Sequence, residues 1–203
     1  MSISMKSLLA AAVASLVVGN AMAADGTINF TGNITAASCN ITGGAGTGVT
    51  GGKGSKIIDV NLGTVSIDAL GGTAGGGIAA GTNINLDLDC GATGTGLTHV
   101  QLRFDPESGS HVDPNNNQLL KLTGDSTAKG VGIGLYKQDG TRINLSNTSD
   151  VFEEELVKAG TDPDYTYSAK LNLRAGYVMT ASDAKGVTAG SANGTLPFTL
   201  TYR

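Results

Sequence analysis

The chain has 203 residues, which corresponds to one domain or a lean two. Its 31 glycines argue against a helical bundle, because glycine is costly inside helices, and its 40% hydrophobic residues argue against a charge-driven disordered chain. The formal net charge is −4 and the cations are not clustered, so a nucleic-acid-binding protein is not expected.

The first residues have the features of an export signal. Lys6 supplies a positive charge, residues 8–18 form an apolar stretch, and residues 21–23 (AMA) have the pattern of a cleavage site. The apolar stretch is shorter than the roughly 20 residues that span a bilayer. We therefore expect residues 1–23 to be a signal peptide and the remainder to be exported, with a buried N-terminal helix as the alternative.

The next segment alternates apolar and polar residues, which is typical of a β-strand. Within residues 25–34, one face carries Ile28, Phe30, Gly32 and Ile34. Such a strand can fold back onto its own sheet, or it can pair with the sheet of another molecule. The alternation alone leaves both possibilities open.

Two cysteines, Cys39 and Cys90, follow in the chain. An even number of cysteines in an exported protein predicts a disulfide. The alternatives are two buried thiols or a metal site. A metal site is disfavoured because zinc needs four ligands, and neither His99 nor His111 lies at a ligand spacing from a cysteine.

Two glycine-rich segments, residues 43–54 and 71–81, are expected to be surface loops. Between them, residues 57–65 (IIDVNLGTV) predict one or two short strand pieces.

The rest of the chain is dominated by alternating patterns with the period of a strand. The turns between them contain Gly, Asp and Asn, so the pattern predicts an antiparallel sandwich. The expected strands are residues 84–90, 100–104, 131–136, a strand beginning at Ile143 and Leu145, 165–173 and 196–202.

One short helix is also expected, at Val151 to Lys158. Asp150 and Glu153 have the spacing of a capping box, and Gly160 is a suitable end for the helix.

Motifs for catalysis are weak. Residues 46–51 fit G-x-G-x-x-G, but no helical pattern follows, and residues 47–54 match a phosphate-binding loop only in part. No G-x-S-x-G elbow occurs, and Asp162-Pro163-Asp164 lacks the acidic spacing of a calcium loop. We therefore expect no enzyme activity, no cofactor and no metal site.

The last expected strand, residues 196–202, runs to within one residue of the end of the chain. Nothing that follows it would cover its outer edge, and a long edge with an apolar face is prone to pairing with another strand. Pro197 lacks a ladder donor, so it predicts the beginning of the strand or a bulge.

These features in this order resemble a chaperone–usher fimbrial subunit of the type 1 major pilin kind. Residues 26–34, leading to Cys39, are similar to the family's donor-strand segment, and residues 60–65 (VNLGTV) resemble part of its first strand. Residues 84–90 resemble the second strand, which carries the partner cysteine, and 167–177 the penultimate one. Tyr202 is the penultimate residue, and Gly190 lies fourteenth from the end.

The resemblance implies an all-β, incomplete immunoglobulin-like sandwich that lacks its last strand and is completed by donor-strand exchange. It implies a signal peptide (1–23), an N-terminal donor-strand extension (24–36) and a pilin domain (37–203). Ile28, Phe30 and Ile34 would enter pockets of a neighbour, and Gly32 would pass where the groove is shallow. The acceptor groove and C-terminal motif would comprise Gly190, Leu196, Phe198, Leu200 and Tyr202.

The partners implied are neighbouring copies in a filament, a periplasmic chaperone and an outer-membrane usher. The expected function is a structural subunit of a surface fimbria that supports cell adhesion and biofilm formation. The alternative is a minor or tip-associated adhesin that binds host glycan.

Overall fold

The computed structural model describes residues 39–70, 75, 77–78 and 81–203. The expected signal peptide and the expected donor-strand residues Ile28, Phe30, Gly32 and Ile34 lie outside the described residues.

Strands dominate the described part of the chain, and its helical turns are short 3₁₀ helices. The 3₁₀ turns are η1 (Ile67–Leu70), η2 (Ala92–Gly94), η3 (Pro106–Ser108) and η4 (Ala184–Gly186). None of the helices within these ranges has the length and apolar character needed to cross a membrane. The strands are β1 (Asn40–Gly43), β2 (Gly48–Thr50), β3 (Ile57–Asp59), β4 (Gly81–Gly91), β5 (His99–Phe104), β6 (Val131–Lys137), β7 (Phe152–Glu155), β8 (Val157–Thr161), β9 (Asp164–Met179) and β10 (Phe198–Tyr202).

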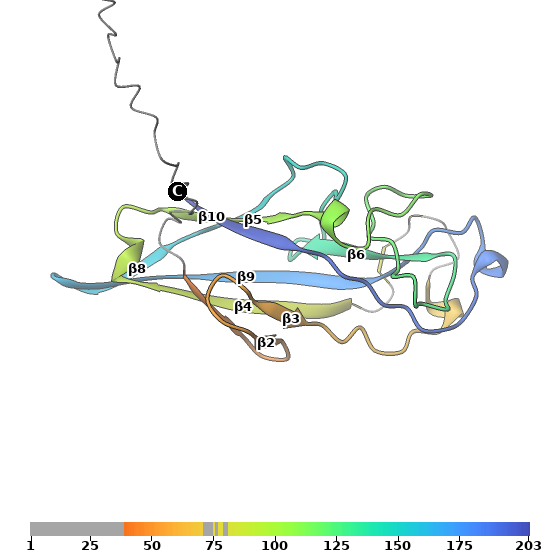
Figure 1. The fold of residues 1–203 in the computed structure, drawn as a ribbon, viewed down its shortest axis with the longest axis horizontal. Coiled ribbons are helices and arrows are strands. Elements are labelled where there is room, and N and C mark those ends of the chain that lie inside the picture. Colours follow the sequence, from red (N-terminus) through yellow and green to blue (C-terminus); the bar gives the residue numbers. More distant parts are fainter. Residues whose placement is uncertain (1–38, 71–74, 76, 79–80) are drawn as a thin grey trace, which may run out of the picture. The chain divides into compact units, whose positions relative to one another are not determined.

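The strands form two main antiparallel sheets (Figure 1). The first sheet has the order β1-β4-β9-β6, and β8 also pairs with β9. The second has the order β10-β5-β7, and β2 and β3 form a separate hairpin. This is the all-β, incomplete immunoglobulin-like sandwich expected from the sequence.

Alternation along β4 and β9 creates the buried face of the first sheet. Leu86 and Leu88 of β4 are almost fully buried, and Leu171 of β9, in register with Leu86, is completely buried. From the second sheet, Val100 and Leu102 of β5 enter the same cluster. The core therefore lies between the two sheets, and each strand contributes every second side chain to it.

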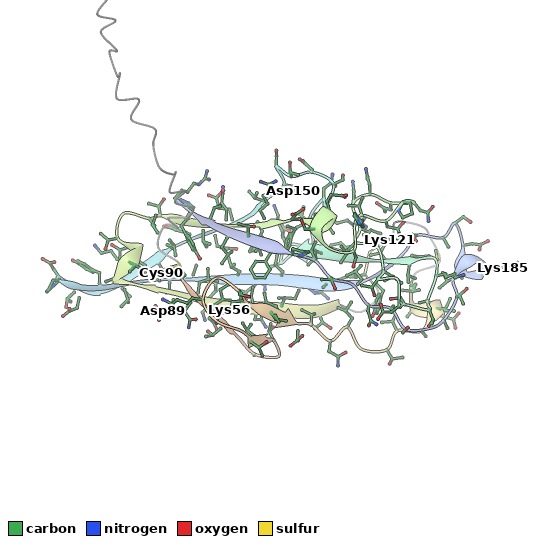
Figure 2. The ribbon with its side chains drawn as sticks, in the orientation of Figure 1. Lys56, Asp89, Cys90, Lys121, Asp150 and Lys185 are labelled. Atoms are coloured by element: carbon green, nitrogen blue, oxygen red, sulfur yellow. A yellow bond between two sulfur atoms is a disulfide. The ribbon has the colours of Figure 1, made fainter. Side chains whose placement is uncertain are left out.

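The disulfide predicted between Cys39 and Cys90 is confirmed. It joins the residue before β1 to the end of β4, which are neighbouring strands of the first sheet. Figure 2 shows Cys90 and Asp89 at one end of the sandwich and Lys185, in η4, at the other. The disulfide thus fixes the end of the sandwich at which β1 begins.

The helix predicted at Val151 to Lys158 is wrong, because this segment forms β7 and β8. Phe152 and Glu154 of β7 pair with β5, and β8 pairs with β9, so one continuous segment passes from the second sheet to the first. The Asp150 carboxylate does not cap a helix; it accepts a hydrogen bond from the backbone N–H of Asn144. Pairing with two existing strands outweighs the local capping pattern.

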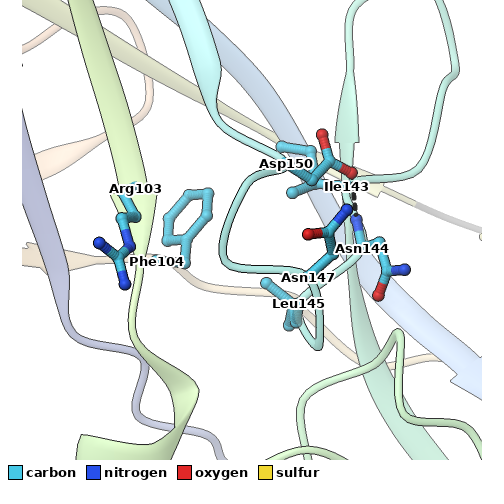
Figure 3. Close-up of a pocket in the computed structure, with 7 residues that line it drawn as sticks. All are labelled: Arg103, Phe104, Ile143, Asn144, Leu145, Asn147 and Asp150. Atoms are coloured by element: carbon cyan, nitrogen blue, oxygen red, sulfur yellow. Dashed lines mark hydrogen bonds between the residues drawn. The ribbon is translucent and has the colours of Figure 1, made fainter.

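The strand predicted to begin at Ile143 and Leu145 is also wrong, although both residues are buried in the core. An isolated bridge between Arg142 and Tyr136 and a hydrogen bond from the Ile143 N–H to the Leu135 carbonyl join this segment to β6, but they do not extend into a strand. The side chain of Asn144 accepts a hydrogen bond from the N–H of Ser146, and with Asp150 it holds a compact turn (Figure 3). Asparagine side chains that bond to nearby backbone groups favour turns over strands.

The glycine-rich segment 43–54 is not only a surface loop, because it contains the end of β1 and the whole of β2. Within residues 57–65, strand structure is confined to β3. Most of the second glycine-rich segment, residues 71–81, lies outside the described residues, and its last residue, Gly81, begins β4.

The final strand begins at Phe198, two residues later than predicted, and Pro197 immediately precedes it. This agrees with the expectation that Pro197 marks the beginning of the strand.

We predict that Leu171→Ala lowers the free energy of unfolding by about 2–5 kcal/mol, because the substitution leaves a cavity between the sheets. The measurement is urea unfolding of the purified chain. Lys170→Ala, at the exposed neighbouring position of β9, is the matched control and should change stability by less than about 0.5 kcal/mol. Equal losses for the two variants would contradict this account of the core.

Candidate functional site

The last strand, β10, has a partner on one side only within the described part of the chain. It pairs antiparallel with β5, from Phe198 opposite Phe104 to Tyr202 opposite Val100. Its other side is an open edge.

The hydrogen bonds to β5 show which backbone groups face the open edge. Arg203 and His99 exchange both of their backbone hydrogen bonds, and the N–H of Asp105 donates to the carbonyl of Pro197. In an antiparallel pair such residues alternate, so every second residue of β10 points its N–H and C=O away from β5. The residues whose backbone faces the open edge are Phe198, Leu200 and Tyr202.

This alternation also explains why Pro197 does not weaken the open edge. Pro197 occupies a position that faces β5, because its carbonyl accepts from Asp105. The donor that proline lacks would therefore have pointed to β5. The backbone donors along the open edge are retained.

The side chains beside the open edge are apolar and only half-buried. Leu196, Phe198, Leu200 and Tyr202 pack against the main core, whereas Thr199 and Thr201 are exposed on the outer face of the sheet. A row of large apolar side chains that the fold leaves half-covered favours the addition of further apolar surface.

A second row of half-buried apolar side chains lies on the segment that starts with β3. Ile58, Val60 and Leu62 alternate with exposed residues and pack against the same core cluster. The carbonyl of Asn61 accepts a hydrogen bond from the Thr82 hydroxyl at 2.8 Å, which places this row beside the start of β4.

Tyr202 links the last strand to the residue that precedes β1. A backbone hydrogen bond from Cys39, just before β1, reaches the Tyr202 side chain. Burial raises the pKa of the Tyr202 hydroxyl, and the Cys39 hydrogen bond opposes this shift. The β1 edge of the first sheet and the β10 edge of the second therefore meet at the end tied by the disulfide.

An ion pair crosses the second sheet and holds the end of β10. The Arg203 guanidinium lies 2.6 Å from both carboxylate oxygens of Glu153 on β7, and Gln101 of β5 donates to the same carboxylate at 2.7 Å. His99 Nε2 lies 3.9 Å from Glu153 Oε1. These partners, Arg203 first, hold the pKa of Glu153 below its usual range.

The sequence alone does not predict this contact, because the capping pattern places Glu153 in a helix and no motif includes Arg203. The only sequence feature that points to an ion pair is the acidic run of residues 153–155. It does not identify Arg203 as the partner, because that requires β7 to be paired with β5.

Gly190, predicted as part of the C-terminal motif, lies before β10 and approaches the loop that precedes β6. A side chain at this position would come within 2.7 Å of the Ala128 backbone nitrogen and would also clash with Thr127. The adjacent Ser191 exchanges backbone and side-chain hydrogen bonds with Thr127. Gly190 therefore permits a close approach that guides the chain toward β10.

The same approach is supported by Tyr177 of β9, whose hydroxyl donates to the carbonyl of Ala192 at 2.7 Å. Burial raises the pKa of Tyr177, so the hydroxyl remains a donor at physiological pH.

The structure brings four of the nine predicted donor and acceptor residues to one edge: Leu196, Phe198, Leu200 and Tyr202. Among residues 39–70, 75, 77–78 and 81–203, no cluster of three or more His, Cys, Asp or Glu side chains has a geometry that could hold a metal ion. The site offers apolar surface and backbone hydrogen-bonding groups, which suit an extended polypeptide.

Comparisons with known proteins agree on one family. The family described as "Fimbrial protein" matches residues 28–203. The Type-1 fimbrial protein subunit of Serratia marcescens is 31% identical over 200 residues, covering 96% of each chain. The Major fimbrial subunit SMF-1 of Stenotrophomonas maltophilia (strain K279a) is 30% identical over 185 residues, covering 90% of this chain and 95% of that protein.

The F17c-G fimbrial adhesin of Escherichia coli is 31% identical over 150 residues, which cover 73% of this chain but only 40% of the adhesin. The crystal structure of the P pilus rod subunit PapA matches with a TM-score of 0.46 at 20% identity, covering 78% of this chain and 100% of that one.

We predict that Glu153→Gln lowers the melting temperature most near neutral pH. Because the folded-state pKa of Glu153 is depressed, its contribution to stability is present above the ordinary carboxyl pKa and is lost as pH falls through the lowered value. The difference in melting temperature between wild type and variant should therefore close below about pH 4. Glu155→Gln, at an exposed position of β7, is the control and should show no such closing difference. A difference that stays constant with pH would show that the ion pair with Arg203 is not its cause.

Proposed function

Because the chain belongs to the fimbrial protein family, we propose that it is a structural pilus subunit in which the open edge of β10 accepts an extended strand from a neighbouring subunit. Fimbrial subunits of this kind assemble with other subunits into a filament at the cell surface. The one-sided pairing of β10 is the observation that carries the proposal.

The open edge has both components that a strand-accepting site requires. The backbone groups of Phe198, Leu200 and Tyr202 offer a ladder of hydrogen bonds, and their side chains offer half-buried apolar surface. In strand addition the ladder provides affinity, and the side chains that alternate along the added strand provide specificity.

We assign the neighbour's residues 24–36 as the added strand. Ile28, Phe30 and Ile34 supply apolar side chains at alternate positions, and Gly32 supplies none, which suits a shallow point of the groove. Burial of each large side chain contributes about 1.5–3 kcal/mol, and each ladder hydrogen bond adds about 0.5–1.5 kcal/mol. The cost of ordering a flexible segment offsets part of this gain.

A contact of this kind joins the extension of one copy to the groove of the next. Since the two surfaces differ, the contact is head-to-tail and propagates as an open filament instead of closing a dimer. Before assembly, the same edge needs temporary cover, because an uncovered apolar edge is prone to aggregation. We assign that cover to a periplasmic chaperone and its exchange to an outer-membrane usher, after export directed by residues 1–23.

A tip adhesin is the second candidate, and the relatives do not favour it. The chain matches fimbrial subunits along almost their whole length, whereas it spans 40% of the F17c-G fimbrial adhesin.

We predict that deletion of residues 25–34 abolishes filaments but leaves chaperone binding intact, because the deletion removes the added strand and not the groove. The measurements are electron microscopy of cells and co-purification with the chaperone. Filaments that persist after the deletion would refute the assigned strand.

We predict that Leu200→Asn weakens filament assembly, because it places an amide among the apolar side chains of the groove without a hydrogen-bond partner. Thr199→Asn, one position away on the exposed face of β10, is the matched control and should assemble as wild type does. The measurement is the fraction of subunits found in filaments after gradient centrifugation. Equal assembly of the two variants would show that the side chains facing the core do not bind the added strand.

A further inference from the structure

The second sheet has another edge, formed by β7. Among the described residues, β7 pairs with β5 only. The backbone N–H of Leu156 donates to the carbonyl of Thr98, so by alternation the backbone groups of Glu153 and Glu155 face away from β5. The edge of β7 therefore presents its own unpaired ladder positions.

The first sheet has a gap on the same side of the sandwich. β8 pairs with β9 as far as Ser168, and β6 pairs with β9 from Leu173 onward. On that side, residues 169–172 of β9 have no strand partner within the described part of the chain. A strand from another molecule could therefore meet unpaired backbone groups of β7 and of β9 here.

A cleft of about 630 Å³ opens at this place, and six of its eight lining residues are polar or charged. It is lined by Glu154 and Glu155 of β7 together with Gln138, Val157, Lys170 and Asn172, among others. The side of the sandwich at β10 is lined instead by rows of apolar side chains. The two open sides of the fold therefore differ in chemistry although both offer free strand edges.

Glu154 lies on the face of β7 that points toward the core. Phe152 and Leu156, two residues away on either side, are buried in the core, so Glu154 occupies the inward-facing position between them. Its register partner on β5 is Val100, which is completely buried. None of the ion pairs in the described ranges involves Glu154, although Lys170 lines the same cleft.

From this arrangement we propose that Glu154 prevents the β7 side of the sandwich from accepting the donor extension, so that strand addition is confined to β10. A strand that paired with β7 would cover the carboxylate of Glu154 with its own side chains. The only charged side chain of residues 24–36 is Asp25, which is itself a carboxylate, so no side chain of the donor extension can neutralise Glu154. Burying an unpaired carboxylate is strongly unfavourable, and an inward-pointing charge is one way in which proteins protect a strand edge.

The proposal rests on the proposed function, because it concerns the choice between two edges for the same donor extension. It adds a residue that decides where the extension binds. In a filament every β10 groove is occupied, so the β7 edges can be tested separately.

The test uses purified filaments of the full exported chain and a fluorescent synthetic peptide with the sequence of residues 25–36. Wild-type filaments should bind peptide only at the filament end, far below one peptide per subunit. Glu154→Val filaments should bind the peptide along their length, at least about tenfold more tightly per subunit, which corresponds to about 1.4 kcal/mol. Glu155→Val is the matched control, because it removes a neighbouring charge from the outward-facing position of β7 and should bind as wild type does.

Should Glu154→Val fail to assemble, Glu154→Gln removes the charge and retains the shape, and it should also bind more peptide than wild type. The proposal is overturned if neither Glu154 variant binds more peptide than wild type, or if Glu155→Val binds as much as Glu154→Val. Failure of the proposed function has a different signature, because filaments would then persist after deletion of residues 25–34.

Discussion

Backbone hydrogen bonding along β10 is the constraint on which the structure depends. Buried or half-buried N–H and C=O groups need partners, and β5 supplies them for only every second residue of β10. The residues whose backbone points away from β5, Phe198, Leu200 and Tyr202, also carry half-buried apolar side chains. Because the backbone groups and the half-covered apolar side chains lie on the same edge, a single extended strand can provide hydrogen bonds to the first and apolar contacts to the second.

The position of β10 is determined by contacts at its two ends. The ion pair between Arg203 and Glu153 crosses β5 at one end, and the close approach at Gly190 directs the chain into the strand at the other. The disulfide holds β1 beside Tyr202. These contacts keep the edge extended and in register before any strand is added, which lowers the entropy lost on binding.

The two open sides of the sandwich differ in the side chains beside them, and in our proposal this difference confines strand addition to β10. Backbone edges are chemically alike, so selectivity must come from the side chains beside them. The β10 side presents leucine, phenylalanine and tyrosine, whereas the β7 side presents carboxylates and amides around a cleft. In our proposal the apolar side chains of the extension therefore match the β10 side and not the β7 side.

Alternating apolar residues predicted β4, β5, β6 and β9 correctly, because a strand that buries one face needs that period whatever its neighbours are. The two cysteines of an expected exported chain predicted their disulfide, and the apolar pattern of residues 196–202 predicted the last strand, β10. Each strand follows from a pattern of neighbouring residues, and the disulfide follows from the number of cysteines in an exported chain.

Tertiary structure decided the features that depend on a neighbour distant in sequence. The capping pattern at Asp150 and Glu153 fits a helix, but β5 and β9 offered strand partners, and their hydrogen bonds outweighed the local preference. The turn after Ile143 has a different, local cause, because the side chain of Asn144 accepts from the nearby backbone N–H of Ser146. The sequence by itself determined that this chain forms short strands and ends in a strand with one apolar face. Only the packed sheets determined which backbone groups of that strand point away from β5, because hydrogen-bond register exists only once two strands meet.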